Sequence, residues 1–120
     1  MRLTAWAAVA AGMMLSMGSA AAQDSVPAYP PYADTTAFVE RELTFGAEPF
    51  VLPATLTLPW SASAAQRVPV IVLVHGSGPH DRDETIGRRK PLRDLAWGLA
   101  SRGIGVLRYD KRTRLHAARM

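Results

Sequence analysis

Alternating hydrophobic and polar residues predict two strands in the first half of the chain. In residues 38–45 hydrophobic side chains fall mainly on one face, and Arg41 interrupts that face, which is typical of an edge strand. Residues 52–59 alternate leucine and alanine with threonine and end at a proline. Because a short Gly-Ala-Glu-Pro turn begins the connection between them, the two strands are expected to form an antiparallel hairpin.

The second half has a different hydrophobic pattern. Residues 68–74 (VPVIVLV) are almost continuously hydrophobic, which indicates a parallel strand that needs cover on both faces. From Pro91, a residue suited to a first helical turn, hydrophobic side chains recur on one helical face, and Gly103 falls where a left-handed cap would end the helix. Residues 104–109 predict another buried strand.

This order of elements predicts an α/β fold: a hairpin followed by a right-handed strand–helix–strand crossover with parallel strands. Ligands of such sheets gather beyond the carboxyl ends of the strands, where the long loop of residues 75–90 emerges. Glycines flank Ser77 in this loop and allow a sharp turn whose amide N–H groups face an anionic oxygen. Chemistry is therefore expected here.

The first 22 residues have the three parts of a secretory signal peptide. Arg2 supplies the charge, residues 3–15 supply the hydrophobic run, and small residues precede an expected cleavage after Ala22. The alternative is an uncleaved anchor, but the strongly hydrophobic run is shorter than the roughly 20 residues that cross a bilayer. We therefore expect a secreted or periplasmic protein without stable membrane insertion after cleavage, in which proline-rich residues 23–37 form an extended linker.

Composition and charge exclude several classes of protein and of functional site. The 120 residues have room for one domain, and 48% hydrophobic with 20% charged residues is ordinary for a folded protein. The absence of cysteine excludes disulfides, a zinc ribbon, an iron–sulfur site and a thiol nucleophile. The formal charge is +4, and the bases concentrate after residue 66. Because these arginines are scattered and form no basic helical stripe, a solvated face is favoured over nucleic-acid binding.

Several motifs in this order resemble the α/β-hydrolases, in particular secreted serine hydrolases similar to dienelactone hydrolase and prolyl oligopeptidase. They are LPATLTLP on the second strand, VIVLVHGSGP at a strand end, the DRDET segment, the PLRDLAWGLASRG helix and VLRYDKRT. Ala54 stands where the family usually has glycine. The resemblance covers residues 38–120 and implies a partial α/β-hydrolase domain. In the family's strand order, strand 104–109 lies between the second strand of the hairpin and strand 68–74, so strand 68–74 becomes an edge of the sheet.

The resemblance implies hydrolysis of carboxylic esters or related acyl groups by a Ser–Asp/Glu–His triad. The family's His-Gly-x loop corresponds to His75, Gly76 and Ser77. By that correspondence the N–H of Ser77, together with that of Gly78, forms part of the oxyanion hole, and the residue after the nucleophile supplies another donor. The implied partner is a small-molecule ester or acyl substrate, and neither a cofactor nor a metal is implied.

The sequence departs from the family pattern in one respect. No Gly-x-Ser-x-Gly occurs in it, Ser77 lies in the wrong spacing, and all three histidines precede the expected place of a triad histidine. The triad is thus absent from this chain. We expect the N-terminal portion of an exported serine hydrolase that is inactive alone. The alternative is a truncated, non-catalytic remnant or binding module that keeps the loop.

Other residues allow two interpretations each. A metal site is one interpretation of the polar loop residues His80, Asp81, Asp83 and Glu84, and bracing of the loop backbone is the favoured one. Asp110 is favoured as a structural residue over a catalytic acid, and His75 as a residue that shapes the loop over a base. Arg93 and Trp97, one helical turn apart, are expected to stack as surface packing.

Overall fold

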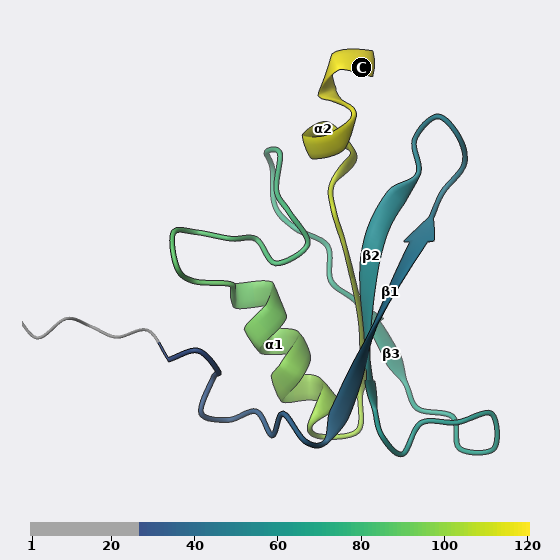
Figure 1. Ribbon diagram of the computed structural model, residues 1–120, viewed down its shortest axis with the longest axis vertical. Helices are drawn as coiled ribbons and strands as arrows, with labels where there is room; N and C mark the ends of the chain where they lie inside the picture. The colour runs from purple at the N-terminus through teal and green to yellow at the C-terminus, as the bar shows by residue number, and fades with distance from the viewer. Residues whose placement is uncertain (1–26) are drawn as a thin grey trace, which may run out of the picture.

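The computed structural model describes residues 27–120 and contains a four-stranded mixed sheet with one helix against it (Figure 1). The expected signal peptide lies outside the described residues. The strands are β1 (Phe38–Phe45), β2 (Leu52–Pro59), β3 (Val70–Val72) and β4 (Gly105–Tyr109). Their order in the sheet is β1-β2-β4-β3.

Strand pairing confirms the predicted architecture. β1 and β2 form an antiparallel hairpin in which Phe38 faces Pro59 and Phe45 faces Leu52. β4 pairs antiparallel with β2 and parallel with β3, so the last strand in the sequence lies between two earlier ones. The partial α/β fold expected from the motifs is therefore present, with β1 at one edge of the sheet and β3 at the other.

Helix α1 (Pro91–Ala100) packs against β4 and β2 and covers one face of the sheet (Figure 1). Proline occupies its first turn, as predicted, because a proline there loses no helical hydrogen bond. Ala96 and Ala100 are buried, and these small side chains let the helix approach the sheet closely. Gly103 follows the helix with φ of +89°, a left-handed conformation that confirms its predicted capping position.

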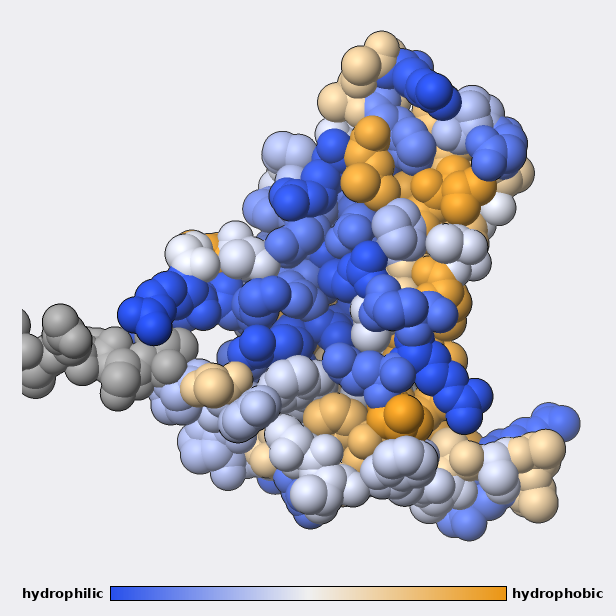
Figure 2. Space-filling view, viewed as in Figure 1, coloured by the Kyte–Doolittle hydropathy of each residue, from blue (hydrophilic) through white to orange (hydrophobic). Residues whose placement is uncertain are grey.

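Strand β3 is shorter than the predicted strand of residues 68–74, and it is solvent-exposed. Val70, Ile71 and Val72 expose 51%, 41% and 51% of their surface. Helix α1 packs on β4 and β2. The hydrophobic side chains of β3 were expected to be covered on both faces of the sheet, and they remain exposed among the described residues. Figure 2 shows hydrophilic residues across the middle of the visible face, with hydrophobic residues in patches along its right-hand side and in its lower part.

The expected linker is packed on the helix. Its described part, residues 27–37, contains no helix or strand and is called here the N-terminal strap. Tyr32 lies over Gly98, where a Cβ atom would be only 2.7 Å from the tyrosine ring, and the backbone of Asp34 exchanges hydrogen bonds with the hydroxyl of Ser101. Tyr29 lies 5.7 Å from the Trp97 ring. The strap therefore packs on α1 and forms a layer outside the helix.

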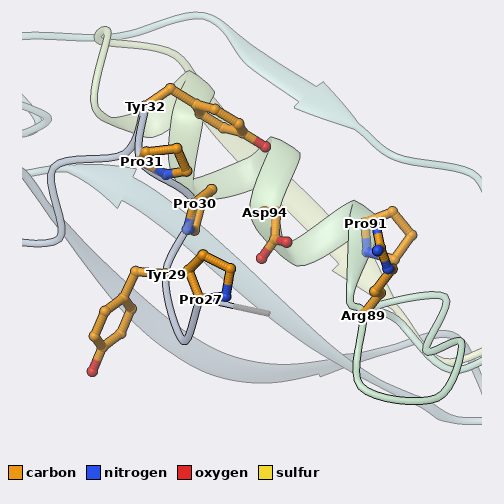
Figure 3. A pocket seen from close by; sticks show the side chains of 8 residues that line it. All are labelled: Pro27, Tyr29, Pro30, Pro31, Tyr32, Arg89, Pro91 and Asp94. Atoms are coloured by element: carbon orange, nitrogen blue, oxygen red, sulfur yellow. The ribbon is translucent and has the colours of Figure 1, made fainter. Parts of the chain in front are cut away.

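A hollow of about 360 Å³ separates the strap from the beginning of α1 (Figure 3). The prolines and tyrosines of the strap line one side, and Arg89, Pro91 and Asp94 line the other. The Asp94 carboxylate is paired with Arg93, whose guanidinium lies 4.6 Å from the Trp97 ring centroid, so the predicted stacking is present.

The described chain ends in two short helices after β4, α2 (Arg112–Leu115) and the 3-10 turn η1 (Ala117–Arg119). Both lie at the end of the sheet where the loop after β3 emerges (Figure 1). Among residues 27–120, no helix has the length and hydrophobicity to cross a membrane.

Candidate functional site

The loops that follow the parallel strands β3 and β4 meet at the carboxyl edge of the sheet. The first is the 75–90 loop, and the second is the β4 exit segment, defined as residues 110–113. The buried His75 joins them, because its Nε2 donates a hydrogen bond to the Tyr109 carbonyl at 2.6 Å. His75 Nδ1 is buried without a partner among residues 27–120. This geometry supports the loop-shaping interpretation of His75.

Arg82 ties the 75–90 loop to three parts of the chain. Its guanidinium binds the Asp110 carboxylate at 3.1 Å, the Glu42 carboxylate at 2.5 Å and the Thr55 hydroxyl at 2.7 Å. Burial by itself would raise the pKa of Asp110, but the hydrogen bonds and charge of Arg82 outweigh it and lower that pKa below its ordinary value. The carboxylate of Asp110 thus serves as a structural partner of Arg82, the interpretation that the sequence favoured.

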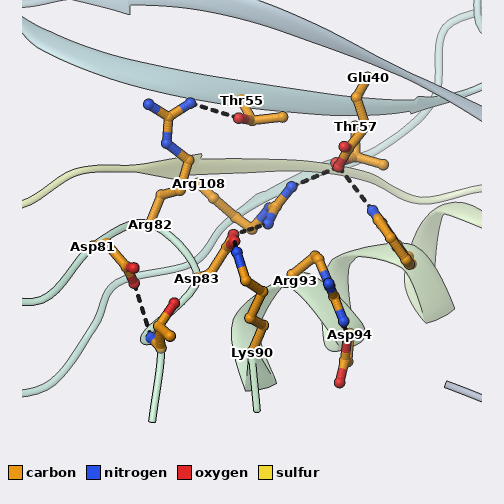
Figure 4. A network of polar contacts seen from close by, with 12 residues as sticks. Glu40, Thr55, Thr57, Asp81, Arg82, Asp83, Lys90, Arg93, Asp94 and Arg108 are labelled. Carbon is orange, nitrogen blue, oxygen red and sulfur yellow. Dashed lines mark hydrogen bonds and ion pairs between the residues drawn. The ribbon is translucent and has the colours of Figure 1, made fainter. Parts of the chain in front are cut away.

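A second network surrounds Arg108 in the middle of β4 (Figure 4). Arg108 is 2% exposed, and its guanidinium binds the carboxylates of Asp83 and Glu40. Lys90 binds the same Asp83 carboxylate at 3.0 Å. The middle of the 75–90 loop is therefore anchored to the sheet through Asp83, its last residue is held to the same carboxylate, and the acidic residues of DRDET mainly brace that loop.

Two glycine-flanked peptide groups, those that end at Ser77 and at Gly78, lie near the beginning of the 75–90 loop. Gly78 has φ of +109°, a conformation that favours glycine, and a Cβ atom there would lie 3.1 Å from His80 Nε2. Within residues 27–120 the N–H groups of Ser77 and Gly78 donate to no protein acceptor. At the carboxyl edge of parallel strands, such donors suit an anionic oxygen.

The residues considered for a metal site do not gather into one. Across the described range, no group of three or more histidine, aspartate or glutamate side chains is arranged to hold a metal ion. Asp83 faces Lys90 and Arg108, and the Asp81 carboxylate accepts the Thr85 N–H at 2.8 Å.

Sequence reasoning missed the contacts of Lys111. This residue follows β4 directly, and its Nζ donates to the Gly76 carbonyl at 2.5 Å. The available signal was its position: a cation just beyond one parallel strand is expected to reach the loop that leaves the neighbouring strand.

Comparison with known proteins gives one strong similarity. The chain is 48% identical over 84 residues to Esterase EstD from Thermotoga maritima, a stretch that covers 70% of this chain and 19% of that relative. The chain thus matches only about a fifth of the relative's length. No family model matches the chain, and no solved structure matches it. The chain is therefore related to an esterase over most of its own length.

Proposed function

We propose that this chain is the N-terminal portion of an exported serine hydrolase that acts on small carboxylic esters. It supplies the strands and the oxyanion loop, whereas the nucleophile, acid and histidine of the triad come from sequence outside these 120 residues. The observation that carries the proposal is the pair of N–H groups of Ser77 and Gly78, which find no acceptor among residues 27–120 and lie at the carboxyl edge of β3.

The chemistry needs such donors. When a serine oxygen attacks an ester carbonyl, the carbonyl oxygen gains negative charge in the tetrahedral intermediate. The N–H groups of Ser77 and Gly78 donate to that oxygen, and a further N–H beside the nucleophile completes the set. Donors held in place before the reaction lower the barrier, because no reorganisation is needed as the charge develops. The similarity to Esterase EstD supports an ester as the substrate class.

A hybrid enzyme tests the role of the loop. The 84-residue stretch of Esterase EstD that matches this chain is replaced by the corresponding stretch of this chain, and hydrolysis of p-nitrophenyl acetate is measured. In this hybrid Ser77→Pro removes the N–H donor and is expected to lower kcat by about 100-fold to 1000-fold, the loss typical of one oxyanion donor.

The matched control is Ser77→Ala, which removes the hydroxyl and keeps the N–H. Its kcat is expected to stay within about twofold of the unsubstituted hybrid, because only the amide is used. A complete loss of activity in Ser77→Ala would identify the hydroxyl as the reacting group and contradict the proposal. Equal activity of both variants, with unchanged thermal melts, would contradict the oxyanion role.

Export is tested separately. The proposal of cleavage after Ala22 predicts that the full chain, expressed in a bacterium with a periplasm, is recovered outside the cytoplasm with Gln23 as its first residue. Mass spectrometry of the recovered N-terminus checks this. Retention of Met1 in the membrane fraction would instead indicate an uncleaved anchor.

A further inference from the structure

We propose that Lys111 and His80 are positioning residues, each of which fixes the direction of one N–H donor in the 75–90 loop. This inference rests on the proposed function, because it explains how the donors are held. It assigns Lys111 to the N–H of Ser77 and His80 to the N–H of Gly78.

The geometry of the peptide group links each carbonyl to the N–H that follows it. A trans peptide is planar, so the C=O of one residue and the N–H of the next point in opposite directions. A side chain that binds the carbonyl oxygen therefore also sets the direction of the following N–H. In this loop, the Gly76 carbonyl governs the N–H of Ser77, and the Ser77 carbonyl governs the N–H of Gly78.

Both of these carbonyls are held by side chains. Lys111 Nζ donates to the Gly76 oxygen at 2.5 Å, and His80 Nε2 donates to the Ser77 oxygen at 2.5 Å. The two N–H groups on the opposite sides find no acceptor in the described chain. Without these side-chain contacts, each glycine-flanked peptide would be free to rotate and turn its N–H away.

The two positioning residues are themselves connected. The backbone N–H of Lys111 donates to the His80 carbonyl at 3.2 Å, so the β4 exit segment holds the loop through both residues. Asp110, the preceding residue, is fixed by Arg82. The lysine is therefore supported from the sheet side, and its side chain reaches the loop from a fixed base.

Thr113 provides an internal comparison. Its hydroxyl donates to the Gly78 carbonyl at 3.3 Å, and the peptide group that follows ends at Pro79, which has no N–H. This third contact secures the loop in the same region without directing any donor. Thr113→Val is thus a matched control for loss of a side-chain contact to a loop carbonyl.

The test uses the full chain, labelled with ¹⁵N and titrated with inorganic phosphate as the anionic probe. In the unsubstituted chain the amide resonances of Ser77 and Gly78 are expected to shift with phosphate. Lys111→Met is expected to reduce the Ser77 response at least threefold and to keep that of Gly78. His80→Phe is expected to do the reverse. Lys111→Arg restores a donor and is expected to recover the Ser77 response, and Thr113→Val is expected to keep both.

The outcomes separate this inference from the proposed function. If the unsubstituted chain shows no phosphate response at either amide, the oxyanion role itself is contradicted, and this inference falls with it. If the responses are present and survive Lys111→Met and His80→Phe, the positioning inference alone is overturned. Equal loss of both responses in all variants, Thr113→Val included, also overturns it, because the contacts would then merely stabilise the loop.

An esterase hybrid whose replaced stretch extends through Thr113 gives a second measurement for variants that do not stay folded in the isolated chain. In this hybrid Lys111→Met is expected to lower kcat on the order of 10-fold to 100-fold with little change in KM. Misplaced donors reduce the stabilisation of the transition state and leave substrate binding unchanged. Lys111→Arg is expected to recover most of kcat, and Thr113→Val to leave it within about twofold. A rise in KM at constant kcat would contradict a positioning role.

Discussion

At the scale of single residues, the position of the 75–90 loop depends on two arginines that join it to the sheet. Arg82 and Arg108 each join carboxylates that are far apart in the sequence, and Arg108 does so from an almost fully buried position. Burial of the Arg108 guanidinium costs free energy because its charge leaves water, and the ion pairs with Asp83 and Glu40 offset that cost. The DRDET motif therefore acts mainly as an anchor for the loop.

Arg108→Met tests that anchor. The substitution leaves Asp83 and Glu40 without their shared partner, and breaking such a buried pair typically costs about 3–5 kcal/mol of the free energy of unfolding. We expect the midpoint of the thermal transition in circular dichroism to fall well below that of the unsubstituted chain. Arg41→Met, which removes an exposed arginine from β1, is the control and is expected to change the midpoint little. Similar melts for both variants would show that the network does not stabilise the fold.

Asp110→Asn tests the pairing with Arg82 through its pH dependence. The folded-state pKa of Asp110 is lowered, so its contribution to stability is present above the unfolded pKa, about 3.9, and is lost as the pH falls through the folded pKa. Asp110→Asn is therefore expected to be less stable than the unsubstituted chain at pH 7, and the difference is expected to shrink below about pH 4. Urea unfolding at pH 7 and pH 3 measures this. A constant difference would contradict the assignment.

At the scale of elements, local patterns predicted each strand and the helix, but not the layer above the helix. Hydrophobic periodicity marked β1, β2 and α1 because each contacts the core on a repeating set of positions, and runs typical of buried strands marked β3 and β4. The N-terminal strap has no such period, since its contacts with Gly98 and Ser101 depend on a tyrosine ring and backbone groups. The contacts of Lys111 were missed for a different reason: its position after β4 was the one signal, and its partner depends on which loops the sheet brings together.

Strand β3 gives the prediction at this scale. An exposed hydrophobic edge strand is a template for pairing with another chain. Val72→Lys places a charge on this edge and is expected to reduce self-association, as measured by light scattering at increasing concentration. Thr44→Lys on the opposite edge strand, β1, is the matched control and is expected to have little effect. If Val72→Lys aggregates as readily as the unsubstituted chain, the β3 edge is not the source.

At the scale of the whole molecule, the described sheet has the 75–90 loop at one end and the hydrophobic strand β3 at one edge. The loop arrives with its donors in place, whereas the sequence contains no Gly-x-Ser-x-Gly nucleophile. The overall α/β arrangement followed from the order of the elements, and the resemblance to the hydrolases directed attention to Ser77 and Gly78. The networks that fix these residues needed the three-dimensional contacts.

We expect the chain by itself to be marginally stable and catalytically silent. Its hydrolysis of p-nitrophenyl acetate should not exceed that of the Ser77→Pro variant, because no activated nucleophile is present. Esterase EstD serves as the positive control. A sharp cooperative melt together with turnover above background would contradict this expectation and would show that the chain contains a complete site.

The position of β4 in the sheet also constrains how the protein is made. A ribosome completes β2 and β3 before the strand that lies between them, so about 30 residues separate the appearance of β3 from that of its partner. During that interval the valines and isoleucine of β3 have no neighbouring strand on which to close. Until Tyr109 has emerged, the exposed β3 side chains of a newly made chain are therefore open to pairing with other chains.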